Sequence, residues 1–218
     1  MRINIKGAVI PNDYKIVYDF FGMESVCPRD VNAALEKANG DSVEVYINSG
    51  GGYIFAGQEI YNALATYAGP CEIKIVGLAA SAASMIAMAR HCLISPVSQM
   101  MIHNVYSEAE GDYRAMHHAG DVLDSASEAL ANAYAIKSKK PVDEIRAMMD
   151  AETWLTADKA LAAGLVDGII PIAAVAAVTA EVLPEAVVQK TLAQMRDQSA
   201  DALEQAKTDF EKLKRSGL

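Results

Sequence analysis

The sequence predicts an α/β fold, in which helices pack in layers against a sheet. In the first half of the chain, short runs rich in β-branched residues alternate with segments of helical periodicity. The 218 residues are 52% hydrophobic and 22% charged, a composition typical of a globular protein. No apolar run approaches the roughly 20 residues that cross a bilayer, so we expect one main domain and no membrane span.

The first half is expected to contain, in order, strand 1–6, strand 42–48, helix 56–68, strand 71–77 and helix 81–89. Apolar and polar residues alternate in the strands, as at Val43, Val45 and Ile47. A glycine turn, Ser49–Gly52, is predicted between the second strand and the first helix. The second helix begins at Ser81 and has almost no polar face. We therefore expect it to be buried.

The second half is expected to contain strand 92–96, strand 99–103, a long alanine-rich helix 112–137, helix 141–149, helix 157–163 and strand 165–170. His103 ends the second of these strands, and Trp154-Leu155 is a brief apolar step. Thr156 is a predicted N-cap and Gly164 a predicted C-terminal stop for the last helix.

The composition changes after Pro171, which predicts a domain over 1–170 followed by an appendage over 171–218. The appendage combines an alanine- and valine-rich linker with an amphipathic C-terminal helix. Apolar residues in that helix recur at intervals of three or four, which approximates a heptad pattern. The helix packs on a neighbour, or it forms a coiled coil or scaffold-docking segment.

The charge and the cysteines exclude several kinds of site. A net charge of −9 argues against nucleic acid, which needs a basic face. Cys27, Cys71 and Cys92 are odd in number and lack a CxxC spacing, so we interpret them as buried thiols. No cluster has metal-ligand spacing, and no metal or organic cofactor is expected. Since residues 1–6 lack the apolar stretch of a secretory signal, we expect a cytoplasmic protein.

Two residues, Ser81 and His103, predict nucleophilic chemistry. A serine hydroxyl becomes a nucleophile when a histidine takes its proton, and acyl transfer also needs backbone donors for the oxyanion. Ser81 begins a helix, where unpaired N–H groups and the helix dipole favour an anion. Gly50–Gly52 would expose further N–H groups. Each feature also has a structural explanation, as a helix cap, a core histidine and a turn.

The order and flanks of these features resemble the family of Clp protease proteolytic subunits. The matching segments are Tyr46–Gly52 with Ala56-Gly57, Gly77–Ala82, Met101–His103 and Thr156–Asp167. The resemblance implies a spiral of ββα units, shared with the crotonase superfamily, with a long protruding helix. It also implies a serine endopeptidase with Ser81 as nucleophile, His103 as general base and the N–H groups of Gly52 and Ala82 as oxyanion hole.

The third triad member departs from the family pattern. Glu152 stands where the family has aspartate, and Asp150 is the alternative on the same segment. Either carboxylate can orient an imidazole, although glutamate is one methylene longer.

The segment Met149–Trp154 and the C-terminal extension resemble the phage and prophage branch that matures virus heads. This branch implies scaffold or capsid proteins as substrates. The first family strand begins here at Arg2, without the preceding axial loops, which weakens the case for an ATP-driven unfoldase of the AAA+ class. The family further implies a heptameric ring, stacked in pairs as a tetradecamer through the helix 112–137.

Three other interpretations stay open at this point. The chain is a housekeeping Clp subunit that degrades proteins delivered by an AAA+ unfoldase, a crotonase-fold acyl-CoA enzyme, or a non-catalytic structural ring.

Overall fold

The computed structural model describes residues 1–171 and, beyond them, only Ala186, Gln189, Lys190 and Ala193. The chain divides into two units, Met1–Ala173 and Ala174–Leu218. Nearly all of the second unit lies outside the described residues. The predicted linker and C-terminal helix over 171–218 therefore stay predictions.

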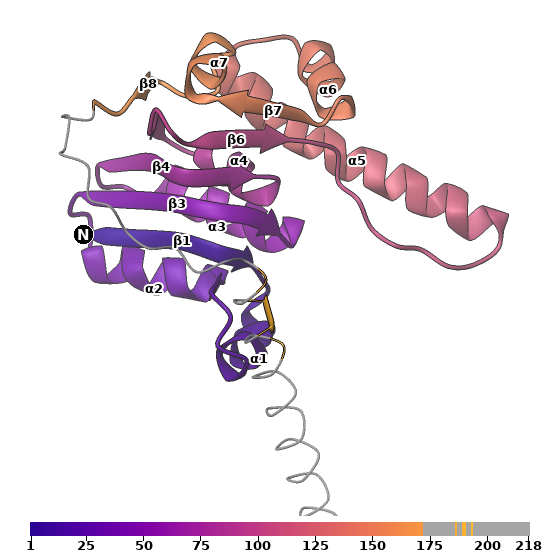
Figure 1. Ribbon diagram of the computed structural model, residues 1–218, viewed down its shortest axis with the longest axis horizontal. Helices are drawn as coiled ribbons and strands as arrows, with labels where there is room; N and C mark the ends of the chain where they lie inside the picture. Colours follow the sequence, from indigo (N-terminus) through magenta and orange to yellow (C-terminus); the bar gives the residue numbers. More distant parts are fainter. Residues whose placement is uncertain (172–185, 187–188, 191–192, 194–218) are drawn as a thin grey trace, which may run out of the picture. The chain divides into compact units, whose positions relative to one another are not determined.

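The described residues form one sheet of eight strands, shown in Figure 1. The strands are β1 (Arg2–Val9), β2 (Ser25–Val26), β3 (Val43–Gly52), β4 (Cys71–Ala80), β5 (His91–Ile94), β6 (Gln99–Ile102), β7 (Thr153–Thr156) and β8 (Gly168–Ile169). Their order is β2-β1-β3-β4-β5-β8, and β6 pairs with both β4 and β7. All pairs are parallel except β6–β7. The predicted α/β class is confirmed.

Strand β4 changes its partner halfway along. Its first half, Glu72–Ile75, pairs with β5, and its second half, Leu78–Ala80, pairs with β6. The Asn48 side chain lies at this change, where its Oδ1 accepts a hydrogen bond of 3.0 Å from the Leu78 N–H. The change carries the end of β4 toward β6, where the candidate site is built.

Helices surround the sheet and vary widely in length. They are the 3-10 turn η1 (Asn12–Tyr14) and the α-helices α1 (Lys15–Phe20), α2 (Pro28–Ala38), α3 (Ile54–Thr66), α4 (Ala82–Ala87), α5 (Tyr113–Ser138), α6 (Val142–Asp150) and α7 (Ala157–Ala162). Every residue of α4 is buried, as its composition predicted. The Thr156 side chain accepts a hydrogen bond from the Lys159 N–H, which confirms the predicted N-cap of α7.

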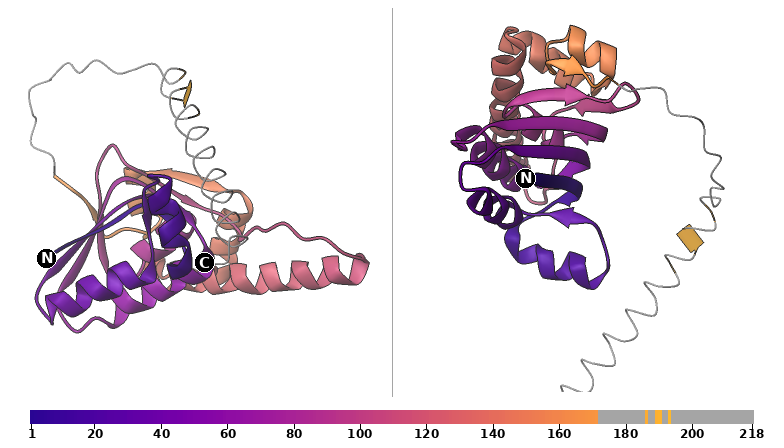
Figure 2. Two further views of the ribbon diagram at one scale, coloured as in Figure 1. Left: turned by 90° about the horizontal axis from the view of Figure 1, so that it is seen from below. Right: turned by 90° about the vertical axis from the view of Figure 1, so that its left-hand side faces the viewer.

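Helix α5 is the long helix that the sequence predicted, and its two halves differ. The Asp112 side chain caps its start by accepting hydrogen bonds from the Arg114 and Ala115 N–H groups. Figures 1 and 2 show the first half projecting away from the sheet. Buried residues begin only at Ser127 and include Leu130 and Tyr134. The second half therefore fixes α5 to the core.

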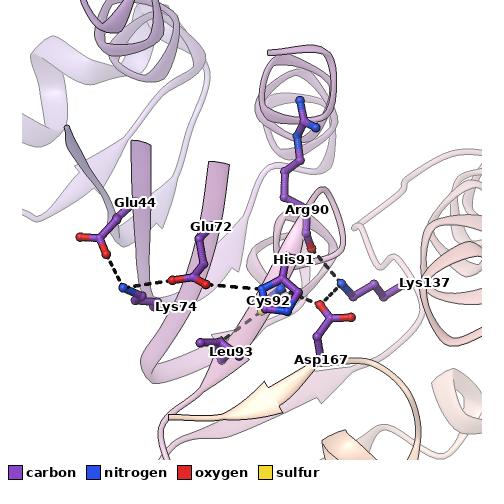
Figure 3. A network of polar contacts seen from close by, with 9 residues as sticks. All are labelled: Glu44, Glu72, Lys74, Arg90, His91, Cys92, Leu93, Lys137 and Asp167. Carbon is purple, nitrogen blue, oxygen red and sulfur yellow. Dashed lines mark hydrogen bonds and ion pairs between the residues drawn. The ribbon is translucent and has the colours of Figure 1, made fainter. Parts of the chain in front are cut away.

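The polar contacts in Figure 3 anchor the end of α5. The Lys137 ammonium donates to the Arg90 carbonyl and pairs with the Asp167 carboxylate. The same carboxylate accepts a hydrogen bond of 2.7 Å from the Cys92 N–H. Burial raises the pKa of Asp167, but the hydrogen bonds from Lys137 and Cys92 outweigh it, and the net pKa is lowered. The contacts tie α5 to β5 and to the segment before β8.

A second group of charged side chains lies across the neighbouring strands β3, β4 and β5 (Figure 3). Lys74 of β4 pairs with Glu44 of β3 and Glu72 of β4, and Glu72 also lies 3.5 Å from the His91 Nδ1 of β5. The hydrogen bonds that Lys74 donates to the Glu44 and Glu72 carboxylates raise the pKa of Lys74. Opposite charges on neighbouring strands stabilise a sheet by roughly 0.2–1 kcal/mol for each pair.

Two features differ from the sequence prediction. Residues 10–41, for which no element was predicted, contain η1, α1, β2 and α2. The predicted glycine turn is wrong, because Ser49–Gly52 continue β3 as strand. Gly51 and Gly52 have φ of 93° and 149°, so the strand uses the conformational freedom of glycine without turning.

Candidate active site

Ser81 occupies a constrained turn between β4 and α4. Its φ of 55° and ψ of −128° lie in a region that costs a residue with a side chain about 1–3 kcal/mol. The Ser81 N–H donates to the Met101 carbonyl of β6 at 3.1 Å. The Ser81 carbonyl accepts from the N–H groups of Ser84 and Met85 in the first turn of α4. Contacts on both sides thus fix the conformation of this turn.

The structure brings Ser81 and His103 together, as predicted. The His103 Nε2 lies 2.8 Å from the Ser81 Oγ. Parallel pairing of β4 and β6 explains this approach, because it places Ala80 opposite Met101. Ser81 directly follows Ala80, and His103 follows two residues after Met101. A hydrogen bond of this length allows direct proton transfer from the hydroxyl to the imidazole.

Gly51 lies directly against the Ser81 turn. A Cβ on Gly51 would come within 2.8 Å of the Ser81 Cβ and 2.9 Å of the Ala82 nitrogen. The Gly51 N–H is fixed by the Ser49 Oγ at 3.0 Å, and Ser49 in turn donates to the Gly7 carbonyl. The sequence alone does not distinguish the role of Gly51 from that of its neighbours Gly50 and Gly52. The signal was present in the run of three glycines, since a glycine in a strand often marks a close backbone approach.

The two residues predicted for the oxyanion hole lie on either side of this contact. Ala82 is the first residue of α4, so its N–H has no acceptor within the helix. Gly52 is the last residue of β3 and packs against β1, where an added Cβ would come within 2.2 Å of the Val9 carbonyl oxygen. Gly52 follows Gly51, the glycine that contacts the Ser81 turn.

Glu152 and Asp150 lie near His103, but neither bonds to it. The antiparallel ladder pairs Ile102 with Thr153, so the next residues along the two chains are His103 and Glu152. The Glu152 carboxylate instead accepts a hydrogen bond of 3.4 Å from the Trp154 Nε1, and its φ is 45°. Asp150 accepts from the Asn104 Nδ2 at 2.7 Å. Within residues 1–171, the His103 side chain makes one hydrogen bond, and its partner is Ser81.

Side chains that could bind a metal ion do not converge in the part of the chain that the structure describes. Among residues 1–171 and the four later ones described, no three His, Cys, Asp or Glu side chains are placed to hold a metal ion. All three cysteines are free; Cys27 and Cys92 are buried and Cys71 is half-buried. Across the same part of the chain, no helix has the length and hydropathy needed to cross a bilayer.

Comparisons with known proteins show which family the chain is related to. The family model described as Clp protease matches residues 30–173, which include Ser81 and His103. An ATP-dependent Clp protease proteolytic subunit from Porphyromonas gingivalis is 31% identical over 138 residues, which are 60% of this chain and 60% of that protein. Subunit 1 from Salinibacter ruber is 29% identical over 133 residues, with 59% and 56% covered. The chain thus spans about 60% of the length of these relatives.

The fold has a counterpart among solved structures. A mutant of ClpP1 from Listeria monocytogenes superposes with a TM-score of 0.63 at 21% sequence identity, covering 78% of this chain and 90% of that one. At this identity the likeness supports the fold alone. The family model covers well over half of the sequence and contains both members of the Ser81–His103 pair. The chain belongs to the Clp protease family.

Proposed function

We propose that this protein is a serine endopeptidase that cleaves peptide bonds through an acyl-enzyme. The observation that carries the proposal is the 2.8 Å hydrogen bond between the His103 Nε2 and the Ser81 Oγ. A serine at a constrained turn, with its hydroxyl on an imidazole, has the geometry that nucleophilic catalysis needs. Membership of the Clp protease family supports the same chemistry.

The reaction would use each group in turn. His103 takes the Ser81 proton as the Oγ attacks the carbonyl carbon of the substrate, and the carbonyl oxygen becomes an oxyanion. The N–H groups of Gly52 and Ala82 would stabilise that charge. The imidazolium then protonates the leaving amine, so the C–N bond breaks and the acyl group stays on Ser81. Water, deprotonated by His103, hydrolyses the ester and restores both residues.

Glu152 is the proposed carboxylate behind His103. Its backbone lies beside His103 in the extension of the β6–β7 ladder. Its carboxylate must leave the Trp154 indole to reach the Nδ1 of the imidazole, and the exposed position of the side chain leaves room for that rotation. Asp150 is the alternative, and it would have to give up its hydrogen bond with Asn104.

For the biological role, we propose maturation of scaffold or capsid proteins inside a homo-oligomeric ring. The support is the resemblance of residues 149–154 to the phage head branch. Exposed large apolar side chains on α1 and at the start of α3, including Ile16, Phe20 and Phe55, favour burial against a second copy. Degradation of proteins delivered by an AAA+ unfoldase is the second candidate. The names of the relatives, which call them ATP-dependent, favour that alternative.

The peptidase proposal is tested by covalent labelling. A fluorophosphonate should modify Ser81 of the full chain, and both Ser81→Ala and His103→Ala should abolish labelling and peptide cleavage. His91→Ala is the matched control, because His91 lies on β5 and contacts Glu72. An unlabelled Ser81 in a folded chain would contradict the proposal. Cleavage of a scaffold protein without ATP, or ATP-dependent loss of a folded substrate with an unfoldase, separates the two roles.

A further inference from the structure

A chain of two buried hydroxyls lies behind the Ser81 turn. Ser84 of α4 and Tyr134 of α5 are both 0% exposed. The Ser84 Oγ lies 2.7 Å from the Ser81 carbonyl oxygen and 2.8 Å from the Tyr134 hydroxyl. The Tyr134 hydroxyl is itself 3.5 Å from the same carbonyl. Nothing in the proposed reaction uses these hydroxyls directly, yet both converge on the main chain of the nucleophile.

The direction of these hydrogen bonds follows from the groups involved. A carbonyl oxygen only accepts, so the single proton of Ser84 is directed to Ser81. With that proton on the 2.7 Å bond to Ser81, Tyr134 donates to the Ser84 oxygen at 2.8 Å, and its 3.5 Å contact with the Ser81 carbonyl is the longer alternative for the same proton. Burial raises the pKa of Tyr134, which keeps the phenol protonated and able to donate. Hydrogen bonds linked in such a chain strengthen one another in a buried setting.

The Ser81 carbonyl and the Ala82 N–H belong to one peptide group. Since a trans peptide is planar, its C=O and N–H point in opposite directions. Contacts that fix the carbonyl toward Ser84 and Tyr134 therefore aim the Ala82 N–H the other way. The Ala82 nitrogen lies on the side of Gly51, where an added Cβ would approach it to 2.9 Å.

We propose that Ser84 and Tyr134 are positioning residues that hold the Ser81–Ala82 peptide, so that the Ala82 N–H is aimed at the oxyanion. The inference rests on the proposed peptidase function and adds which side chains fix the direction of the Ala82 N–H. Ser81 has an unfavourable φ of 55°, a conformation that persists only where the surroundings impose it. The backbone N–H groups of Ser84 and Met85 supply part of that constraint, and the two hydroxyls add to it from two different helices.

The position of Tyr134 is itself fixed by the rest of α5. Lys137, three residues later on the same helix face, binds the Arg90 carbonyl and the Asp167 carboxylate. The buried end of α5 is thereby anchored to β5, independently of the Ser81 turn. Tyr134 can consequently act as a fixed reference for the position of Ser84 and the Ser81 carbonyl.

The test compares Tyr134→Phe and Ser84→Ala, each of which removes one hydroxyl, in the full chain. Active sites are counted with a fluorophosphonate, and kcat, KM and the affinity for a peptide aldehyde are measured. Two variants remove similar groups elsewhere. Ser98→Ala deletes a buried hydroxyl that bonds the Ile75 carbonyl, and Tyr67→Phe deletes a phenol that bonds the Asp41 carbonyl.

Loss of a whole oxyanion donor costs about 10²- to 10³-fold in kcat, so we expect misalignment to cost about tenfold per titrated site. KM should stay within about twofold, because the donor acts mainly in the transition state. Binding of the aldehyde, whose adduct carries the oxyanion, should weaken in parallel. Ser98→Ala and Tyr67→Phe should match the wild type.

Two outcomes would overturn the inference, and they differ in meaning. If the wild type is active and both variants keep its kcat per titrated site while losing only thermal stability, the hydroxyls have a purely structural role. If the folded wild type neither labels nor cleaves, the peptidase function itself fails.

Discussion

Gly51 and Ser81 lie so close together that no side chain fits between them. A Cβ on Gly51 would lie 2.8 Å from the Ser81 Cβ and 2.6 Å from the Ala80 carbonyl oxygen. The φ of Gly51 is 93°, a value that residues with a side chain rarely adopt. Space and backbone conformation therefore both require glycine at the position that supports the Ser81 turn.

Gly51→Ala is expected to lower peptide cleavage by about 100-fold or more, because a shift of roughly 1 Å in the reacting groups has effects of that size. Gly50→Ala is the matched control, since an added Cβ there meets nothing within 4 Å. Rates per titrated site with one peptide substrate provide the comparison. Equal rates for the two variants would show that the close approach does not support the site.

Glu152→Gln is expected to lower kcat by about 10²- to 10⁴-fold, because a neutral amide cannot stabilise the imidazolium and favours the wrong tautomer. Asp150→Asn should have a smaller effect, since Asp150 contacts Asn104. Steady-state kinetics of both variants rank the two carboxylates. The reverse ranking would give the orienting role to Asp150, and full activity in both would leave His103 without a carboxylate partner.

Asp167→Asn is expected to lower the free energy of unfolding at pH 7 by about 1 kcal/mol, because its ion pair and hydrogen bond lose their charge in a partly solvated place. The folded state lowers the pKa of Asp167. Its contribution is therefore complete above the ordinary aspartate value of about 3.9 and is lost as the pH falls through the lower folded value.

Urea unfolding at several pH values measures this effect. The wild type and the Asp167→Asn variant should differ at pH 7 and converge as the pH falls below the lowered pKa of the folded state, where the carboxylate is protonated in both states. A difference that stays constant across this range would mean that the charge of Asp167 contributes nothing.

Cys92 is expected to resist alkylation in the native chain. Burial raises the pKa of its thiol to about 12, so almost no thiolate exists at pH 8. Half-buried Cys71 should react first with iodoacetamide, although burial raises its pKa as well. Peptide mapping before and after urea treatment gives the order in which the cysteines are alkylated. Native labelling of Cys92 as fast as that of Cys71 would contradict the packing of β5.

The sequence was sufficient for the elements whose residues alternate or repeat clearly. Val43, Val45 and Ile47 are all buried in β3, as their alternation predicted. The apolar composition of α4 predicted its complete burial, and Ser81 is the residue that directly precedes this buried helix. The approach of His103 depended on the family resemblance, because the pairing of β4 with β6 follows from tertiary structure.

Other elements gave weaker signals or none. Helix α1 is only six residues long and its apolar side chains are exposed, so its sequence is too short to show a helical period and its apolar residues mark no core position. Helix α2 did carry a signal, with Pro28 at its first turn and Val31, Leu35 and Ala38 buried at helical spacing. The contact between Ser84 and Tyr134 joins two helices that are far apart in the sequence, and local patterns carry no information about such a pair.

Tyr134 is separated from Ser81 by 53 positions along the chain. During translation, Ser81 and His103 therefore leave the ribosome well before Tyr134, the residue proposed to support their geometry. A nascent polypeptide that ends between His103 and Tyr134 has both reacting groups but lacks this brace. Under the proposed function, the order of synthesis would therefore keep an unfinished chain on a polysome from cutting its neighbours at the full rate.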